Sequence, residues 1–516
     1  MVCRMSVDSV LGTAELLHEI LGHCSTKDNA RNALVSKVWS NEALGILWYR
    51  VDSLRPLLNL LVPLEPSPSL LVFTRSITPM DWARFQKYSP RIYELKAHDW
   101  ALYDASVFAE IAFSRPSLDL FPHLRSVDVE GARSQYISLF SHATISSLRV
   151  RVAVANRPDV RGLTGMLSYL PDRTPKLEQL DLGVETRANI PCQLHEVLPR
   201  LRHLKTLRIS DTLFDADLRV LHSIAQLPKL ELLWVSSLEG QRWRDGSHGA
   251  PYPGPVALPN SGFPALISLR LLHSLEYAAS LIEEYALANL RTCTILSRAP
   301  ENGHDFVRIF EAVAENCPML GKLVLDGARS NLQPRVSTHD LLQPLVRCRS
   351  LTELYLQAAI PLNLTISSVS SFLKALPAMQ TFVLYEDPAM AGPPTLPLSA
   401  LALLVPICPN MKIMSLYMDT LKHTPITGAA NTPYPSLECL DMGLSPLNSS
   451  TAEVAAFLSG VLPEGCRLDF HGEDPAISTN YSSWASVANL LPTLIQIRKA
   501  ERAMLAAKRS AGATVC

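Results

Sequence analysis

A short apolar pattern recurs along most of the 516-residue chain and limits the folds open to it. An apolar residue is followed by two variable residues, a second apolar residue, one variable residue and a third apolar residue. The segment Leu320–Leu325, which reads LGKLVL, is one copy. The first apolar residue of each copy, here named the anchor, occurs at Ile92, Leu124, Ile145, Leu177, Leu204, Leu230, Leu266, Leu290, Leu320, Leu351, Met379, Met411 and Leu437.

The spacing of the anchors indicates a stack of small repeated units. The steps run from 21 residues (Leu124 to Ile145) to 36 residues (Leu230 to Leu266). Apolar helical stretches such as Phe306 to Asn316 lie between anchors, and another, Thr451 to Val461, follows the last anchor. A unit of one strand and one helix cannot bury its own apolar face, so neighbouring units must stack. This period is typical of leucine-rich repeats. The predicted fold is therefore α/β, a curved solenoid with parallel strands on the concave face and helices on the convex face.

Composition narrows the classes of partner and compartment. The chain has 47 basic and 48 acidic residues, a net charge of −1, so bulk charge predicts neither a nucleic-acid nor a membrane partner. No apolar run reaches the roughly 18 residues that a membrane span requires, and Met1 to Val10 lacks the apolar core of an export signal. We expect the protein in the cytoplasm, the nucleus or both.

The sequence contains no motif that predicts catalysis, a cofactor or a metal site. Phosphate-binding loops, dinucleotide-binding loops and the common hydrolase signatures are absent from it. His18, His23 and Cys24 lie close together, but their spacing does not suit tetrahedral zinc. Cys317, Cys348 and Cys408 each stand three residues before an anchor, which favours small, buried, reduced residues. We therefore expect a protein that is not an enzyme and carries no cofactor.

The segment before the first anchor has a helical pattern without the repeat. One helix should place Leu16, Leu17, Ile20 and Leu21 on a single face. A second should begin near Ser25–Asp28 and run to about Trp39, with Leu34, Val35 and Val38 on its apolar side. A third should start at Ser40–Glu42 and carry Ala43, Leu44, Leu47 and Trp48. So much apolar surface on a small module indicates either a docking face or a cap for the open end of the repeats.

These helices resemble an F-box in the order and spacing of three stretches, ELLHEIL (15–21), ALVSKVW (33–39) and ALGILW (43–48). VDSLRPLL (51–58) and DWARF (81–85) are similar to the continuation seen in fungal F-box proteins with leucine-rich repeats. Ala14 stands where F-boxes usually have Pro, and Leu21 where Phe is common. The resemblance implies a substrate receptor that binds a Skp-type adaptor within a cullin–RING ubiquitin ligase. The implied adaptor contacts are Leu16, Leu17, Ile20, Leu21, Val38, Trp39, Leu47 and Trp48.

The same patterns predict how the chain is divided. We expect an F-box-like helical domain over 1–62, a Pro- and Ser-rich linker with a lead-in helix over 63–90, the repeats over 91–475, and a capping helix with a tail over 476–516. The long step before Leu266 holds an inserted loop at about 241–255. The alternative to a ligase receptor is a repeat scaffold or regulator whose N-terminal helices serve only as a cap.

Strand alternation predicts which side chains a bound protein would meet. Residues alternate between the two faces of a strand, so the one between the second and third apolar positions should face the concave surface. The residue two positions further on, which is Tyr385 or Tyr417 in two of the copies, should face the same way. Arg, Trp and Tyr dominate binding hot spots. We therefore predict that an unidentified protein substrate, presenting an acidic or phosphorylated segment, contacts Arg208, Trp234, Arg270, Tyr355, Tyr385 and Tyr417.

Overall fold

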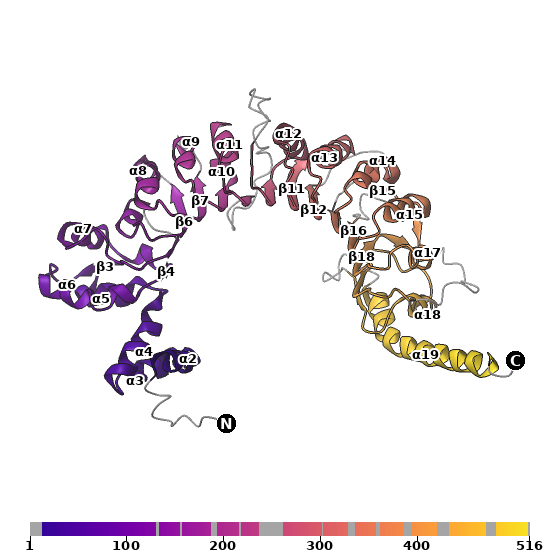
Figure 1. Cartoon of the computed structure of the whole chain (residues 1–516), viewed down its shortest axis with the longest axis horizontal. Helices are drawn as coiled ribbons and strands as arrows, with labels where there is room; N and C mark the ends of the chain where they lie inside the picture. Colours follow the sequence, from indigo (N-terminus) through magenta and orange to yellow (C-terminus); the bar gives the residue numbers. More distant parts are fainter. Residues whose placement is uncertain are drawn as a thin grey trace. The chain divides into compact units, whose positions relative to one another are not determined.

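The structure, a computed structural model, describes residues 13–130, 134–154, 157–186, 193–215, 218–236, 262–301, 303–328, 336–357, 362–385, 394–420, 433–470 and 481–513. The chain divides into two compact units, Met1–Arg242 and Trp243–Cys516. In both, strands lie along one side and helices along the other (Figure 1). The predicted loop at 241–255 lies outside the described residues.

The strands of the first unit form a parallel sheet in chain order. Each strand pairs in parallel with the next one named. The order is β1 (Arg50–Val51), β4 (Glu94–Ala97), β5 (Ser126–Glu130), β6 (Ser147–Val154), β7 (Gln179–Thr186), β8 (Thr206–Ser210) and β9 (Leu232–Ser236). Because every connection returns to the same end of the sheet, helical segments lie between the strands. Three helices precede β1: α2 (Ala14–Gly22), α3 (Thr26–Asn32) and α4 (Lys37–Tyr49). The segments between the strands are α5 (Leu54–Leu61), α6 (Pro79–Phe85), η1 (Ser89–Arg91), η2 (Trp100–Leu102), α7 (Ala105–Ser114), η3 (Ser134–Leu139), α8 (Arg157–Arg173), α9 (Leu194–Val197), η4 (Leu198–Arg200), α10 (Asp211–Phe214) and α11 (Leu218–Ala225).

The second unit repeats this arrangement. Its parallel strands, again in chain order, are β10 (Ser268–Leu272), β11 (Thr292–Pro300), β12 (Lys322–Ala328), β14 (Glu353–Gln357), β16 (Thr381–Tyr385), β18 (Ile413–Leu416), β20 (Cys439–Asp441) and β21 (Arg467–Asp469). Two further parallel pairs join β13 (Val336–Ser337) to β15 (Leu362–Asn363) and β17 (Leu396–Pro397) to β19 (Met418–Asp419). The helical segments are α12 (Leu275–Tyr285), α13 (Gly303–Asn316), α14 (Thr338–Leu342), η5 (Gln343–Arg347), α15 (Ile366–Ala375), α17 (Ala400–Leu404), α18 (Thr451–Val461) and α19 (Tyr481–Ala513).

The anchor side chains lie in the hydrophobic core of both units. All of the predicted anchors are buried, with Leu437 the most exposed at 3%. A tight turn precedes each strand: the amide of Leu320 donates to the carbonyl of Cys317 at 3.1 Å, and the amide of Leu351 to that of Cys348 at 3.0 Å. Cys317, Cys348 and Cys408 are buried, as predicted. The periodic pattern is thus confirmed as a repeat of strand and helical connection, the architecture of leucine-rich repeats.

The N-terminal helices pack around a small core of their own. Leu17, Leu21 and Ala43 are buried together, with Ala33, Trp39 and Ile46 packed against them. The predicted boundary between the second and third helices is wrong. Helix α3 ends at Asn32 and α4 begins at Lys37, because the Ser36 hydroxyl accepts a hydrogen bond from the Trp39 amide at 3.3 Å and caps α4. Leu34 and Val35 therefore lie in the turn between two helices.

The predicted division at residues 62 and 90 also needs correction. Arg50 pairs with Glu94 and Val51 with Leu95, so the sheet begins inside the segment predicted as a separate helical domain. The Pro- and Ser-rich segment predicted as a linker forms an antiparallel hairpin of β2 (Leu64–Ser67) and β3 (Leu70–Phe73), followed by α6. A hairpin, unlike a linker, satisfies its backbone groups by its own pairing, and it connects α5 to α6.

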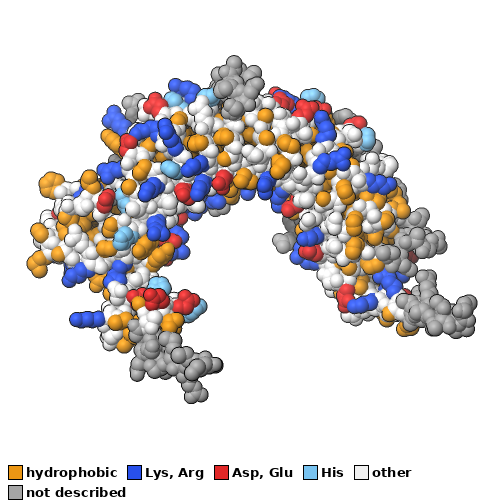
Figure 2. Space-filling view, in the orientation of Figure 1, with side chains coloured by type: hydrophobic (Ala, Val, Ile, Leu, Met, Phe, Trp, Pro, Cys, Tyr) orange, Lys and Arg blue, Asp and Glu red, His pale blue; other side chains and the backbone are white. Residues whose placement is uncertain are grey.

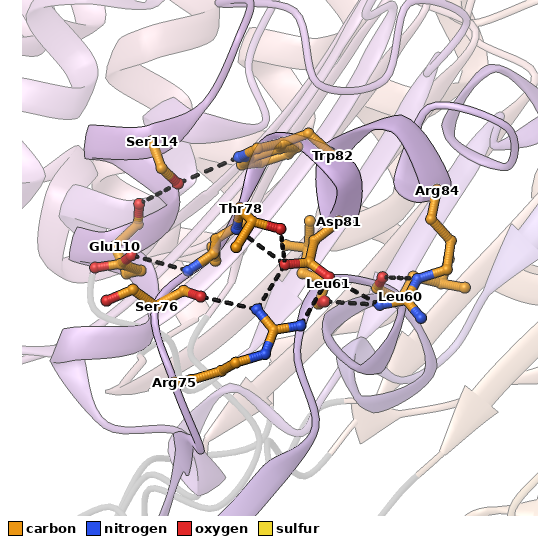
Figure 3. A network of polar contacts seen from close by, with 11 residues as sticks. Leu60, Leu61, Arg75, Ser76, Thr78, Asp81, Trp82, Arg84, Glu110 and Ser114 are labelled. Atoms are coloured by element: carbon orange, nitrogen blue, oxygen red, sulfur yellow. Dashed lines mark hydrogen bonds and ion pairs between the residues drawn. The ribbon is translucent and has the colours of Figure 1, made fainter.

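A buried carboxylate holds this region together (Figure 3). Asp81 accepts hydrogen bonds from both terminal nitrogens of Arg75, at 2.7 and 2.9 Å, and from the amide and hydroxyl of Thr78, at 2.9 and 2.7 Å. Arg84, one turn further on, donates to the carbonyls of Leu60 and Leu61 at 2.7 and 2.9 Å. Helix α6 is thereby tied to the C-terminal end of α5. The DWARF segment (81–85) therefore has a structural role in this region.

Candidate interaction surfaces

The exposed apolar side chains of the N-terminal helices form the first candidate surface. On α2, Leu16 and Ile20 lie one turn apart and are 40% and 43% exposed. At the start of α4, Val38 is 48% exposed, and Leu34 and Val35 in the preceding turn are exposed as well. Nothing in the described part of these helices buries them, although their chemistry favours burial. We name Leu16, Ile20, Leu34, Val35 and Val38 the apolar helix surface.

Several residues predicted to contact an adaptor instead hold the module together. Leu17 and Leu21 are 0% and 1% exposed, so a direct contact role for them is wrong: the face of α2 that carries them packs on Ala43. Trp39 is partly buried against the same cluster. Leu47 is half-buried. Trp48 is half-buried too, and its ring lies 5.1 Å from that of Tyr88, next to the first repeat.

The second candidate surface is the side of the first unit's sheet that faces away from the helices. Alternate residues of each strand, such as Leu95, Val127 and Leu148, are buried in the core, while the residues between them are half-buried. Register pairing places the half-buried ones in a single row across the sheet. We name the surface that contains it the strand face. The row is Lys96, Asp128, Arg149, Asp181, Arg208 and Trp234, which confirms the row predicted from the pattern.

Charges of opposite sign alternate along this row. Arg149 lies between two carboxylates, with its Nη1 3.4 Å from Asp128 Oδ2 and its Nε 3.1 Å from Asp181 Oδ2. Burial raises the pKa of Asp181 despite the neighbouring arginines. Lys96 pairs with Glu94 on its own strand at 2.7 Å. The guanidinium of Arg208 lies over the ring of Trp234, 4.6 Å from its centroid. Figure 2 shows basic and acidic side chains close together along this side of the unit.

An open hollow of about 390 Å³ lies on the strand face. Its lining includes Lys96, Asp128, Arg149, Asp181 and Arg208 from the charged row. The row two residues earlier on each strand adds hydrogen-bonding groups, from Ser126, Ser147, Gln179 and Thr206. The hollow therefore offers donors and acceptors in a regular array, beside the apolar residues Val127, Leu148, Leu180 and Leu232.

In the second unit, register again places the predicted row in line, but most of its C-terminal part is buried. The row runs through Arg270, Thr294, Val324, Tyr355, Val383, Ser415 and Asp441. Arg270 and Tyr355 are half-buried, and the ammonium of Lys322 lies 5.0 Å from the centroid of the Tyr355 ring. Val383, Ser415 and Asp441 are 2%, 1% and 5% exposed, so the expectation that their side chains face an open concave surface is wrong. Both faces of strand β20 are covered.

One of the predicted tyrosines, Tyr417, does not belong to this surface. Tyr417 is buried, at 6% exposure, because the chain leaves the main sheet after Leu416 and enters β19, which pairs with β17. Strand alternation cannot be extended across that change of partner. The side chain of Tyr385 lies outside the described residues. Arg270 belongs to the second unit and Arg208 and Trp234 to the first, so the structure does not define the three as one site.

The reasoning from the strand pattern missed Arg151, which follows Arg149 on the same face of β6. It pairs with Gly183 on β7, and that residue brings no side chain to the strand face. The signal was available in the sequence, because Arg149 and Arg151 have the i, i+2 spacing that keeps both on one face.

Comparisons with known proteins do not establish the fold of this chain, so the fold assignment rests on the strand register. No family model and no curated protein matches the chain. Among solved structures, the Rad7 and Elc1 complex from yeast is similar at 13% identity and a TM-score of 0.34, over 81% of this chain and 90% of that one. The leucine-rich repeat-containing protein LegL7 from Legionella pneumophila is similar at 12% identity and a TM-score of 0.29, over 75% and 94%. Scores this low do not establish a shared fold.

Among the residues that the structure describes, no three His, Cys, Asp or Glu side chains form a group that could hold a metal ion. His18 lies 3.2 Å from Glu42, which links α2 to α4. No helix within the described ranges is both long enough and apolar enough to cross a membrane.

Proposed function

We propose that this protein is a substrate receptor of an SCF-type ubiquitin ligase. In this proposal the apolar helix surface binds a Skp-type adaptor of a cullin–RING complex, and the strand face holds the protein to be ubiquitylated. The receptor needs no nucleophile of its own, because holding the substrate near the charged enzyme raises the effective concentration of the acceptor lysine. The protein is therefore not itself an enzyme.

The observation that carries the proposal is the exposure of Leu16, Ile20 and Val38. The module has a core to which these residues do not belong, so its fold gives no reason for their apolar character. They lie within the stretches that resemble an F-box, where that family binds its adaptor. The parallel repeat beside the module supports the second half of the proposal, because stacked repeats present extended surfaces for protein partners.

Co-purification with a Skp-type adaptor tests the proposal. The triple substitution Leu16→Ala, Ile20→Ala and Val38→Ala removes exposed side chains only, so the helices should stay folded while adaptor binding weakens by at least about tenfold. The matched control is Leu403→Ala on α17, which truncates another exposed leucine, at 54%, in the second unit. Retention of the adaptor by the triple variant, with circular dichroism unchanged, would exclude the ligase assignment.

A second function is favoured by contacts on the other side of the module. Arg91 donates to the carbonyl and side-chain oxygens of Asn41 at 2.9 and 2.8 Å, and the rings of Tyr49 and Tyr93 stack 5.1 Å apart. These contacts support a cap over the first strand of the sheet, and a repeat scaffold outside any ligase would need no more. For such a scaffold the triple substitution should leave every partner bound.

A further inference from the structure

The last strand of the second unit, β21, is open along its outer edge. It pairs in parallel with β20, and within the described part of the chain no strand pairs with its other side. The amide of Arg467 donates to the carbonyl of Glu438 at 2.9 Å. The carbonyl of Asp469 accepts from the amide of Met442 at 2.9 Å. Alternate residues make such a ladder, so the N–H and C=O of Leu468, between these two, point away from β20.

The apolar core beside this edge is only partly covered. Met414 and Leu440, which hold the corresponding register positions on the two preceding strands, are 0% exposed, whereas Leu468 is half-buried. Phe470 is half-buried as well, and its ring lies 5.2 Å from that of Tyr481, which is 46% exposed. Apolar surface next to unpaired backbone groups is a template for another strand.

The charges on β21 match those of a second copy of the same strand. Arg467 and Asp469 lie on one side of the strand, two residues apart, with Nη2 and Oδ2 2.7 Å from each other. When two β21 strands run antiparallel about a two-fold axis at Leu468, each Arg467 stands opposite the partner's Asp469, which favours pairing. The two Leu468 residues on the axis then exchange two backbone hydrogen bonds. We infer that β21 binds β21 of a second copy of this chain and so forms a symmetric dimer.

The first strand of the sheet carries the same pair of charges but fits β21 less well. Arg50 and Asp52 are exposed and lie 2.6 Å apart. The carbonyl of Tyr49, just before β1, accepts a hydrogen bond from the residue that precedes β4, so Val51 also directs its backbone groups toward β4. An antiparallel pair of β1 and β21 can therefore oppose the charges or align the outward backbone groups, but not both. A contact between identical strands also closes at two copies, whereas a head-to-tail contact continues.

Sedimentation equilibrium of the full-length protein between about 1 and 200 μM tests the inference. We expect monomer and dimer without larger species, with a dissociation constant in the micromolar range because the strand contact is small. Asp469→Arg places like charges opposite each other and should weaken the dimer by at least about tenfold. Arg467→Asp combined with Asp469→Arg exchanges the two charges and should recover the dimer to within about threefold.

Two further variants separate backbone pairing from charge. Leu468→Pro removes the outward N–H but no hydrogen bond to β20, so it should abolish the dimer while the protein stays folded. Asp52→Arg is the matched control, because it reverses the same kind of exposed pair on β1 and should leave association unchanged. Thermal unfolding of each variant checks that the second unit is folded.

Four results would each overturn the inference. They are a monomer at every concentration, assemblies larger than a dimer, a dimer that survives Asp469→Arg or Leu468→Pro, and a dimer that is lost with Asp52→Arg. Failure of the folded charge-exchange variant to associate would also overturn it, because the opposed charges would then play no part in the contact.

Discussion

Two aspartates of the first unit show how neighbours decide the state of a carboxylate. Asp81 accepts hydrogen bonds from Arg75, which lowers its pKa far below the ordinary value, and the Thr78 bonds add to the effect. Asp181 also has arginines nearby, yet burial outweighs them and raises its pKa. The difference lies in direct hydrogen bonds: those at Asp81 stabilise the charged form, whereas the arginines beside Asp181 compensate only part of the lost hydration.

The lowered pKa of Asp81 predicts an acid-dependent loss of stability. A carboxylate whose folded pKa lies below its unfolded value near 3.8 contributes its full stability above that value and loses it as the pH falls toward the folded pKa. Asp81→Asn should therefore lower the free energy of unfolding by about 2 kcal/mol at pH 7, a figure reduced for the exposure of Arg75. Urea denaturation from pH 7 to pH 2.5 measures it.

The difference between the two unfolding free energies should shrink steadily as the pH falls below about 3.8, where the unfolded carboxylate takes up a proton while the native one is still charged. The matched control is Asp52→Asn, since Asp52 pairs with Arg50 at 2.6 Å on an exposed surface and should change stability little. A constant difference between Asp81→Asn and the unchanged protein at every pH would mean that packing, not charge, explains the effect.

At the scale of single elements, a helix that packs closely on a strand limits the size of the side chains that fit between them. An added Cβ at Gly327 of β12 would lie 2.9 Å from Cζ of Phe306, a buried side chain of α13. Gly327→Ala should therefore displace the ring and lower the stability of the second unit by roughly 1–3 kcal/mol. Thermal unfolding measures the loss. The additional change Phe306→Leu should recover part of it if the ring is the obstacle.

The elements could be predicted wherever a local pattern decides them. Helix α18 begins and ends where the apolar stretch from Thr451 to Val461 does, and every anchor is buried. The hairpin of β2 and β3 was not predicted, because its Pro and Ser residues are typical of a linker. The pairing of its two strands does not depend on a periodic sequence pattern, so no such pattern could predict it. The start of α4 depends on which serine caps it, Ser36 or Ser40, and tertiary packing makes that choice.

The candidate surfaces were predictable to a similar degree. Register confirmed the row on the strand face because a strict period of two fixes which side chains share a face. Burial of Val383 and Tyr417 could not be read from that period, since it depends on what covers the strand and on where the chain changes partner. Leu17 and Leu21 were assigned to the wrong side because apolar character alone does not distinguish a core residue from a contact residue.

Across each unit as a whole, a stack of repeats depends on its ends. Helix α19 packs on α18, and Trp484 is buried with its indole N–H donating to the carbonyl of Ser445 at 2.9 Å. Trp484→Ala should cost about 3–5 kcal/mol locally. In a repeat stack the loss should spread only to neighbours. Hydrogen exchange should therefore accelerate at β20, β21 and α18 and stay unchanged at β5 to β8.

A matched comparison is Leu490→Ala, which shortens an exposed side chain of the same helix and should leave exchange unchanged throughout. Equal acceleration in both units after Trp484→Ala would show that the molecule opens as one cooperative block.

The buried thiols of Cys293, Cys348 and Cys408 in the second unit can report how often the repeats around them open. Burial raises the pKa of Cys293 and Cys408 to about 12 and that of Cys348 to about 11, so almost no thiolate exists at neutral pH. An alkylating reagent can modify them only while the repeat around each one is open. The modification rate at each cysteine, measured by mass spectrometry, would then report how often the repeat around it opens. No label or substitution would have to be introduced.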